Sequence, residues 1–138
     1  MRIAFQHLRL PILIVLLAGL ACNFPAATPP ATPRLTEAWM AQDYNGEQPT
    51  SIFGQQDTFY CIARLENSGA ESAVRAVWTA ISGEGVEPNT PIDQVELATR
   101  SGALHFELSN AGPWPVGVYQ VELYLNGELD RTLEFIVQ

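Results

Sequence analysis

The chain has 138 residues, with seven basic and 15 acidic side chains and a formal net charge of −8. Two of the basic residues, Arg2 and Arg9, precede residue 22, so the rest of the chain has a larger acidic excess. Because such a chain lacks a basic surface, no nucleic-acid partner is expected. The length fits one domain with one hydrophobic core.

Residues 1–21 have the composition of an export signal. Arg2 and Arg9 form a basic start, residues 10–20 are almost wholly apolar, and small residues precede Cys22. The apolar run has about a dozen residues, fewer than the roughly 20 that span a membrane. This pattern predicts an exported protein whose leader is cleaved, with an uncleaved anchor as the alternative.

The residues before Cys22 resemble the lipobox of bacterial lipoproteins. Gly19, Leu20 and Ala21 precede the cysteine, with the leucine and the small residue in exchanged order. The resemblance implies that the Cys22 thiol receives a diacylglyceryl group and anchors the protein to the cell membrane or outer membrane, facing the periplasm or the exterior. The same three residues also suit the general secretory peptidase, which would release an unmodified chain.

Residues 22–34 are expected to form a linker. Residues 23–33 contain four prolines, no charged residue and one large apolar residue, Phe24. Such a segment cannot form a core and favours polyproline II, which rises about 3.1 Å per residue and could hold a domain roughly 35 Å from a bilayer. We therefore interpret it as a tether, the alternative being an ordinary disordered terminus.

Residues 35–138 are expected to form the folded domain. Short runs of β-branched and aromatic residues alternate with Gly, Pro, Asn and Ser, and no long stretch has helical spacing. Strands are predicted at 35–42, 50–54, 57–66, 73–82, 92–99, 103–109, 116–125 and 128–137. Seven or eight short strands at this spacing predict an all-β antiparallel sandwich.

Alternation along the strands predicts which side chains face the core. The inward sets are Phe59, Cys61, Ala63 and Leu65; Val74, Ala76, Trp78 and Ala80; and Leu104, Phe106 and Leu108. Tyr60, Ile62 and Arg64 are expected to face outward, and His105 is expected to face water. Asn126-Gly127 between two strand-like runs predicts a closing hairpin with a type I′ turn.

The order of three motifs resembles immunoglobulin-like and fibronectin type III-like sandwiches. Cys61 lies on an early strand, Trp78 on the next, and Gly117-x-Tyr119-x-Val121 on a late one. The resemblance implies an Ig-like domain in which Trp78 packs between the sheets and Tyr119 ties a corner to nearby backbone. Val121 stands at the position of the second cysteine, so Cys61 has no partner and is expected to be a small buried core residue.

The block GPWPVGVYQVELYLNGELDRTLEFIV, residues 112–137, is similar to the closing hairpins of bacterial envelope lipoproteins with one Ig-like domain. The similarity extends loosely over residues 28–138. It implies fold and location only, because its motifs are structural.

No catalytic residues, metal site or cofactor are expected. After residue 22, His105 is the remaining histidine, and no Gly-x-Ser-x-Gly elbow occurs. Cys61 and His105 fall on opposite faces, which excludes an ordinary zinc site. A catalytic function would have to rest on His105 with Glu107. Two acidic fragments, residues 43–47 and 84–93, are more simply loops than calcium sites.

Trp114, between Pro113 and Pro115, is a candidate contact for a protein or carbohydrate ligand, or alternatively a cap on the sandwich. The sequence thus predicts a membrane-tethered, non-catalytic binding or structural module of the bacterial cell envelope. The alternatives are a secreted enzyme or enzyme accessory domain, and a periplasmic assembly subunit. An assembly subunit would show a long, exposed, uncharged edge strand.

Overall fold

The computed structural model describes residues 25–138, so the predicted signal at residues 1–21 and the lipidation candidate Cys22 lie outside the described residues. The described chain has eight strands, and each overlaps a predicted one. They are β1 (Arg34–Ala41), β2 (Ile52–Phe53), β3 (Phe59–Glu66), β4 (Ser72–Gly83), β5 (Thr90–Thr99), β6 (Gly102–Leu108), β7 (Gly117–Leu125) and β8 (Glu128–Val137). Within residues 25–138, no helix is long and apolar enough to cross a membrane.

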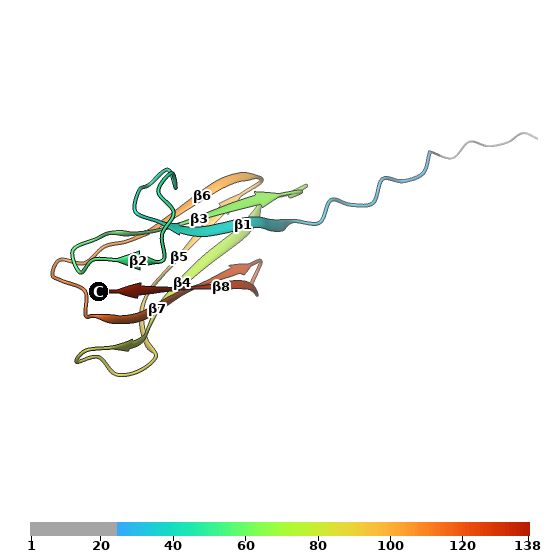
Figure 1. Ribbon diagram of the computed structural model, residues 1–138. Helices are drawn as coiled ribbons and strands as arrows, with labels where there is room; N and C mark the ends of the chain where they lie inside the picture. Colours follow the sequence, from blue (N-terminus) through green and yellow to red (C-terminus); the bar gives the residue numbers. More distant parts are fainter. Residues whose placement is uncertain (1–24) are drawn as a thin grey trace, which may run out of the picture.

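The strands form two facing sheets, which confirms the predicted all-β sandwich (Figure 1). One sheet has the order β1-β3-β6 and the other β2-β8-β7-β4-β5. All pairs are antiparallel except β2 with β8, which is parallel. The chain thus contributes its first strand to the smaller sheet and then adds the two-residue β2 to the edge of the larger one.

The sandwich has two distinct ends. The linker enters β1 at one end, called here the linker end, where the β3–β4, β5–β6 and β7–β8 turns also lie. The opposite far end holds the β4–β5 turn, the 109–116 loop and the C-terminus (Figure 1). The linker therefore lies at one end of the strands, and the β4–β5 turn of the larger sheet lies at the other end.

The inward-facing sets predicted by alternation are confirmed. The predicted inward side chains of β3, β4 and β6 are all at most 6% exposed. Cys61, Trp78, Tyr119 and Val121 lie buried in the same core. Trp78 pairs with Val121 between β4 and β7, and Cys61 is a free cysteine on the facing sheet. Packing therefore replaces an inter-sheet disulfide at this position.

A cluster of aromatic rings joins the two sheets toward the far end. Phe59 on β3 lies with its ring centroid 4.9 Å from Phe53, 4.8 Å from Phe135 and 5.9 Å from Tyr119. Those three rings come from β2, β8 and β7 of the other sheet. Aromatic pairs in such edge-on and tilted arrangements each stabilise the fold by about 0.5–1.5 kcal/mol beyond the effect of the apolar area that they bury.

Two local features that the sequence predicted are present in the structure. The Tyr119 hydroxyl donates a hydrogen bond to the Pro115 carbonyl at 2.6 Å, which is the corner contact that the resemblance implies. Asn126 and Gly127 have φ angles of 50° and 88°, as a type I′ turn requires. The Asn126 side-chain oxygen also accepts a hydrogen bond from Ala73 N, so the hairpin tip is tied to β4.

The edge strand β5 carries features that oppose pairing with another chain. Its exposed side chains include Pro91, Asp93 and Glu96, and a bulge at Trp78/Thr79 disturbs its pairing with β4. Charge, proline and bulges on an edge are common protections against strand addition. This edge thus lacks the uncharged character expected of an assembly subunit.

Gly117 allows a close approach of β7 to β4 beside the bulge at Ala80/Ser82. A Cβ at Gly117 would lie 2.0 Å from the Ser82 carbonyl oxygen and 2.6 Å from Gly83 Cα. Because both obstacles are backbone, we expect Gly117→Ala to lower the free energy of unfolding by about 2 kcal/mol or more in urea titrations. Gly112→Ala is the control, since nothing lies within 4 Å there, and equal losses at both positions would contradict the explanation.

Candidate functional site

The segment 42–50, called here the flap, folds over the outer face of the smaller sheet. The Trp39 indole N–H donates to the Gly46 carbonyl at 3.0 Å, and Gly46 packs against Ile62 so closely that a Cβ would lie 2.7 Å from Ile62 Cγ1. Ile62 therefore lies on the outward face as expected, but it is buried there. Alternation placed Ile62 on the correct face, but the flap covers that face.

The flap also carries an exposed aromatic surface. Tyr44 stacks on His105 with centroids 4.5 Å apart and meets Tyr60 edge-on at 6.3 Å. His105 Nδ1 lies 2.6 Å from the Tyr44 carbonyl oxygen. His105 thus faces outward as expected, but its ring is half covered, while Tyr44 remains 56% exposed. Nothing in the polar sequence around Tyr44 indicated that it would lie on the sheet.

Asp43 closes the flap by hydrogen bonding and belongs to one of the acidic fragments considered for calcium. Its carboxylate accepts from the backbone N–H groups of Gln48 at 2.7 Å and Glu47 at 3.1 Å. Desolvation acts to raise the pKa of Asp43, but these donors lower it overall. In the part of the chain that the structure describes, no group of three or more His, Cys, Asp or Glu side chains could hold a metal ion.

Trp114 caps the aromatic cluster at the far end. Its ring stacks on Phe59 at 4.7 Å, and its indole N–H donates to the Asp57 carbonyl at 2.9 Å. The Trp114 backbone N–H donates to the Gln55 carbonyl at 2.7 Å. The side chain is only 6% exposed, so it does not project as a free contact residue. Trp114 thus takes the capping arrangement that the sequence left as the alternative.

Beside Trp114, a small pocket opens at the far end of the sandwich. β5 and β6 are joined by a turn at the linker end and separate toward the far end (Figure 1). The pocket has a volume of about 160 Å³ and lies between the β4–β5 turn with the start of β5 and the 109–116 loop. Its apolar lining consists of Ala80, Val86, Ile92, Trp114, Pro115 and Tyr119. Sequence reasoning identified Trp114 here but not the pocket, because the lining comes from four separate segments.

Acidic residues are next in sequence to two of the residues that line this pocket. Val86 lies in the β4–β5 turn between Glu84 and Glu87, and Asp93 follows Ile92 on β5; all three acidic residues are exposed. The turn is held against the next loop, since Glu84 N–H donates to the Val116 carbonyl at 3.0 Å. The far end therefore combines an apolar hollow with the acidic side chains of Glu84 and Glu87 on the turn that supplies one of its walls.

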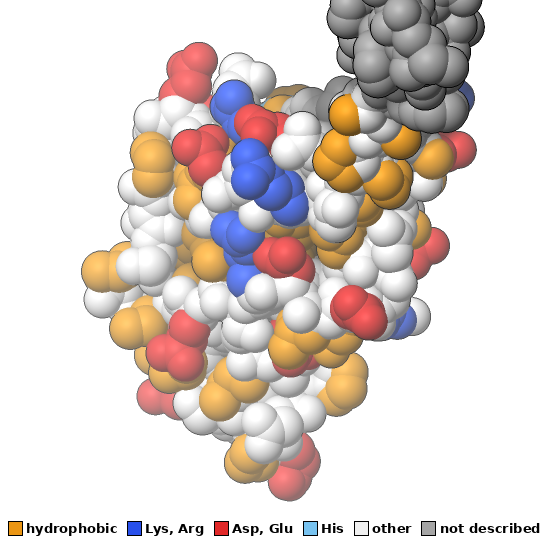
Figure 2. Space-filling view, turned by 90° about the vertical axis from the view of Figure 1, so that its right-hand side faces the viewer, with side chains coloured by type: hydrophobic (Ala, Val, Ile, Leu, Met, Phe, Trp, Pro, Cys, Tyr) orange, Lys and Arg blue, Asp and Glu red, His pale blue; other side chains and the backbone are white. Residues whose placement is uncertain are grey.

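The basic side chains lie toward the other end. Arg34, Arg64, Arg75, Arg100 and Arg131, the basic residues among positions 25–138, are all placed by strand register in the half nearest the linker. Figure 2, which views this end, shows basic side chains gathered in a stripe with carboxylates between them. The far half carries Asp43, Glu47, Asp57, Glu84, Glu87, Asp93, Glu107 and Glu134. The domain is thus electrically polarised along its strands.

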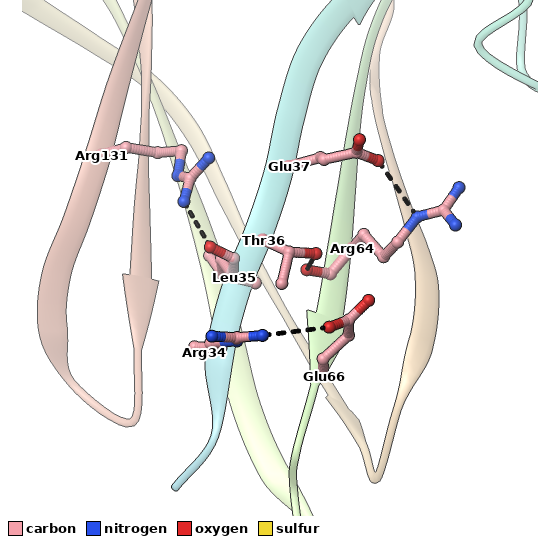
Figure 3. Close-up of polar contacts among 7 residues, drawn as sticks. All are labelled: Arg34, Leu35, Thr36, Glu37, Arg64, Glu66 and Arg131. Atoms are coloured by element: carbon pink, nitrogen blue, oxygen red, sulfur yellow. Dashed lines mark hydrogen bonds and ion pairs between the residues drawn. The ribbon is translucent and has the colours of Figure 1, made fainter.

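Polar contacts fix β1 where the linker enters (Figure 3). Arg34 lies 3.6 Å from Glu66, and Arg64 lies 3.3 Å from Glu37, so two ion pairs join β1 to β3. From the other sheet, Arg131 on β8 donates to the Leu35 carbonyl of β1. Arg131 therefore crosses the seam between β1 and β8, and it lines an open groove of about 530 Å³ there.

No family model matches this chain. No curated protein matches it either. Among solved structures, an immunoglobulin-like protein of Pseudomonas aeruginosa is similar, with a TM-score of 0.55 and 13% identity over 80% of this chain and 100% of that one. A Pseudomonas fluorescens alkylpurine DNA glycosylase (TM-score 0.51, 13% identity, 78% of this chain and 31% of that one) and a Listeria innocua β-glucosidase (0.53, 9%, 78% and 16%) are also similar. At these identities the likeness shows the fold alone, an Ig-like β-sandwich.

Replacing Trp114 should mainly reduce stability. We expect Trp114→Ala to lower the free energy of unfolding by about 3 kcal/mol, because a large buried ring and its stacking on Phe59 are lost. Trp114→Phe should cost less, since a ring remains and mainly the hydrogen bond to Asp57 disappears. Denaturant titration of both variants gives the measurement. A loss below about 1 kcal/mol for Trp114→Ala would contradict the capping role.

The Cys61 thiol should make stability depend on pH in the alkaline range. Burial raises its pKa from 9.0 to about 12, against a smaller opposing effect of the Arg131 charge. Below pH 9 the thiol is protonated in both states; above it the unfolded chain loses a proton that the folded chain keeps. The free energy of unfolding should therefore fall from about pH 9 upward, more steeply in the parent protein than in Cys61→Ala. Identical slopes would contradict this assignment.

Proposed function

We propose that this chain is a membrane-tethered, non-catalytic binding module of the bacterial cell envelope, anchored through Cys22 and presenting its far end to a partner. The observation that carries the proposal is the placement of the linker and of the pocket beside Trp114 at opposite ends of one sandwich. Figure 1 shows the two ends. A tether at one end leaves the other end free to meet a ligand. The β-sandwich supplies a fixed scaffold for the loops of the far end, and binding residues commonly lie on loops held by such a scaffold.

The described part of the linker supports this arrangement. Residues 25–33 form no strand or helix, and nearly all of them are exposed. The chain then enters β1, where Arg34 pairs with Glu66 and Leu35 accepts from Arg131 of the other sheet. A pull on the linker would thus be passed to both sheets. Exposed ion pairs of this kind contribute little stability by themselves, about 0–1 kcal/mol each, so their effect is local positioning.

The charge distribution supports an outward orientation of the far end. Bacterial membranes carry anionic lipids, and an acidic surface is repelled from them within about a Debye length, roughly 8 Å at physiological salt. The half next to the linker carries all five arginines found among the described residues together with seven acidic residues, whereas the far half carries the other eight acidic residues and no arginine. Repulsion is therefore weakest when the linker end faces the bilayer.

The tether is tested by the intact mass of the protein from its native host. We expect the membrane fraction to contain residues 22–138 with an added diacylglyceryl group, and Cys22→Ser to remove the protein from that fraction. The matched control is Cys61→Ser, which leaves the lipidation candidate in place. An unmodified chain found in the medium would reject the tether and leave a small secreted sandwich.

A further inference from the structure

The pocket at the far end has a size that fits one apolar side chain. Its volume of about 160 Å³ is close to that of cavities that admit a benzene-sized group. Ala80, Ile92 and Trp114 provide apolar walls, while Thr90 and Asn110 add polar groups. Burial of a leucine or isoleucine side chain in such a hollow would remove apolar surface from water on both partners.

The pocket is shaped before any ligand arrives. Trp114 is held by stacking on Phe59 and by its hydrogen bond to Asp57, and the Tyr119 hydroxyl is held by Pro115. A fixed wall reduces the conformational entropy that binding would otherwise cost. Apolar anchors inserted into such fixed pockets carry much of the free energy in protein–protein interfaces.

The charges around the pocket select the kind of partner. Glu84 and Glu87 flank Val86 in the turn that forms one wall, whereas Asp93 alternates to the opposite face of β5 from the lining residue Ile92. Over residues 25–138, the half of the domain that contains the pocket has no basic side chain to neutralise them. An acidic segment would be repelled there, whereas lysine or arginine beside the apolar anchor would be attracted.

We propose that the far-end pocket binds a basic polypeptide segment, inserting one aliphatic side chain between Val86, Ile92 and Trp114 while flanking lysines or arginines face Glu84 and Glu87. This inference rests on the proposed function as a binding module and adds the chemical class of its partner. The apolar anchor provides most of the affinity, and the carboxylates provide selection for positive charge and faster association.

The test uses the protein in the form in which its host exports it and three short peptides with blocked ends. The probe is Lys-Lys-Leu-Lys-Lys, compared with the same peptide carrying Ala in place of Leu and with Glu-Glu-Leu-Glu-Glu. Affinity is measured by calorimetry, and the site by the indole N–H signals of the three tryptophans in a ¹H–¹⁵N spectrum. Trp114 reports on the pocket, Trp39 on the flap, and Trp78 on the core.

We expect the Leu peptide to shift the Trp114 signal and to bind about tenfold or more tightly than the Ala peptide, because the aliphatic group is the anchor. The acidic peptide should show no binding. Glu84→Gln combined with Glu87→Gln should weaken the Leu peptide roughly threefold per carboxylate and flatten its salt dependence. Val86→Phe should abolish binding by filling the pocket, and its thermal unfolding and indole spectrum check that the fold persists.

The control for charge is Glu71→Gln combined with Glu128→Gln, which makes the same change in net charge at the linker end. Affinity should be unchanged in this variant. Equal binding of the Leu and Ala peptides, equal weakening by both double variants, or a shift of Trp39 without Trp114 would each overturn the proposal. The tether is judged separately by the intact mass, so failure of peptide binding leaves that result untouched.

Discussion

The sandwich depends on the contacts of Phe59, because its two sheets are held together by packing and not by a covalent bridge. Cys61, the cysteine among the described residues, is free, and Val121 occupies the facing strand beside Trp78. Phe59 extends from the smaller sheet into rings that belong to three strands of the larger one. Removing such a buried aromatic side chain typically costs 3–5 kcal/mol, a large part of the stability of a domain this size.

The same cluster determines the shape of the far end. Trp114 stacks on Phe59 from a loop, so the loop between β6 and β7 is fixed to the core and not left mobile. β5 and β6 belong to different sheets and separate toward this end (Figure 1). The apolar hollow beside Trp114 lies there, between the β4–β5 turn and the 109–116 loop. The candidate site thus depends on where the 109–116 loop is fixed relative to the β4–β5 turn.

The two ends of the domain have different chemistry. At the linker end, arginines and carboxylates pair around β1 and hold it to both sheets (Figure 3). The far half, which contains the apolar pocket, carries carboxylates and no arginine among the residues described. This division of charge underlies both proposals, the orientation relative to an anionic bilayer and the preference for positively charged partners.

The sequence by itself determined the positions of the strands along the chain, the core faces and the closing hairpin, because these follow from local periodicity and turn chemistry. Asn126-Gly127 specifies its turn through positive φ angles, and alternation along β3, β4 and β6 places the core residues. Only the tertiary structure determined the positions and surroundings of Ile62, Tyr44 and Trp114. Each is positioned by residues distant in the sequence: Ile62 by Gly46, Tyr44 by His105, and Trp114 by Phe59. Periodicity assigns a side chain to a face, but whether another segment covers that face, or leaves a pocket in it, depends on long-range packing.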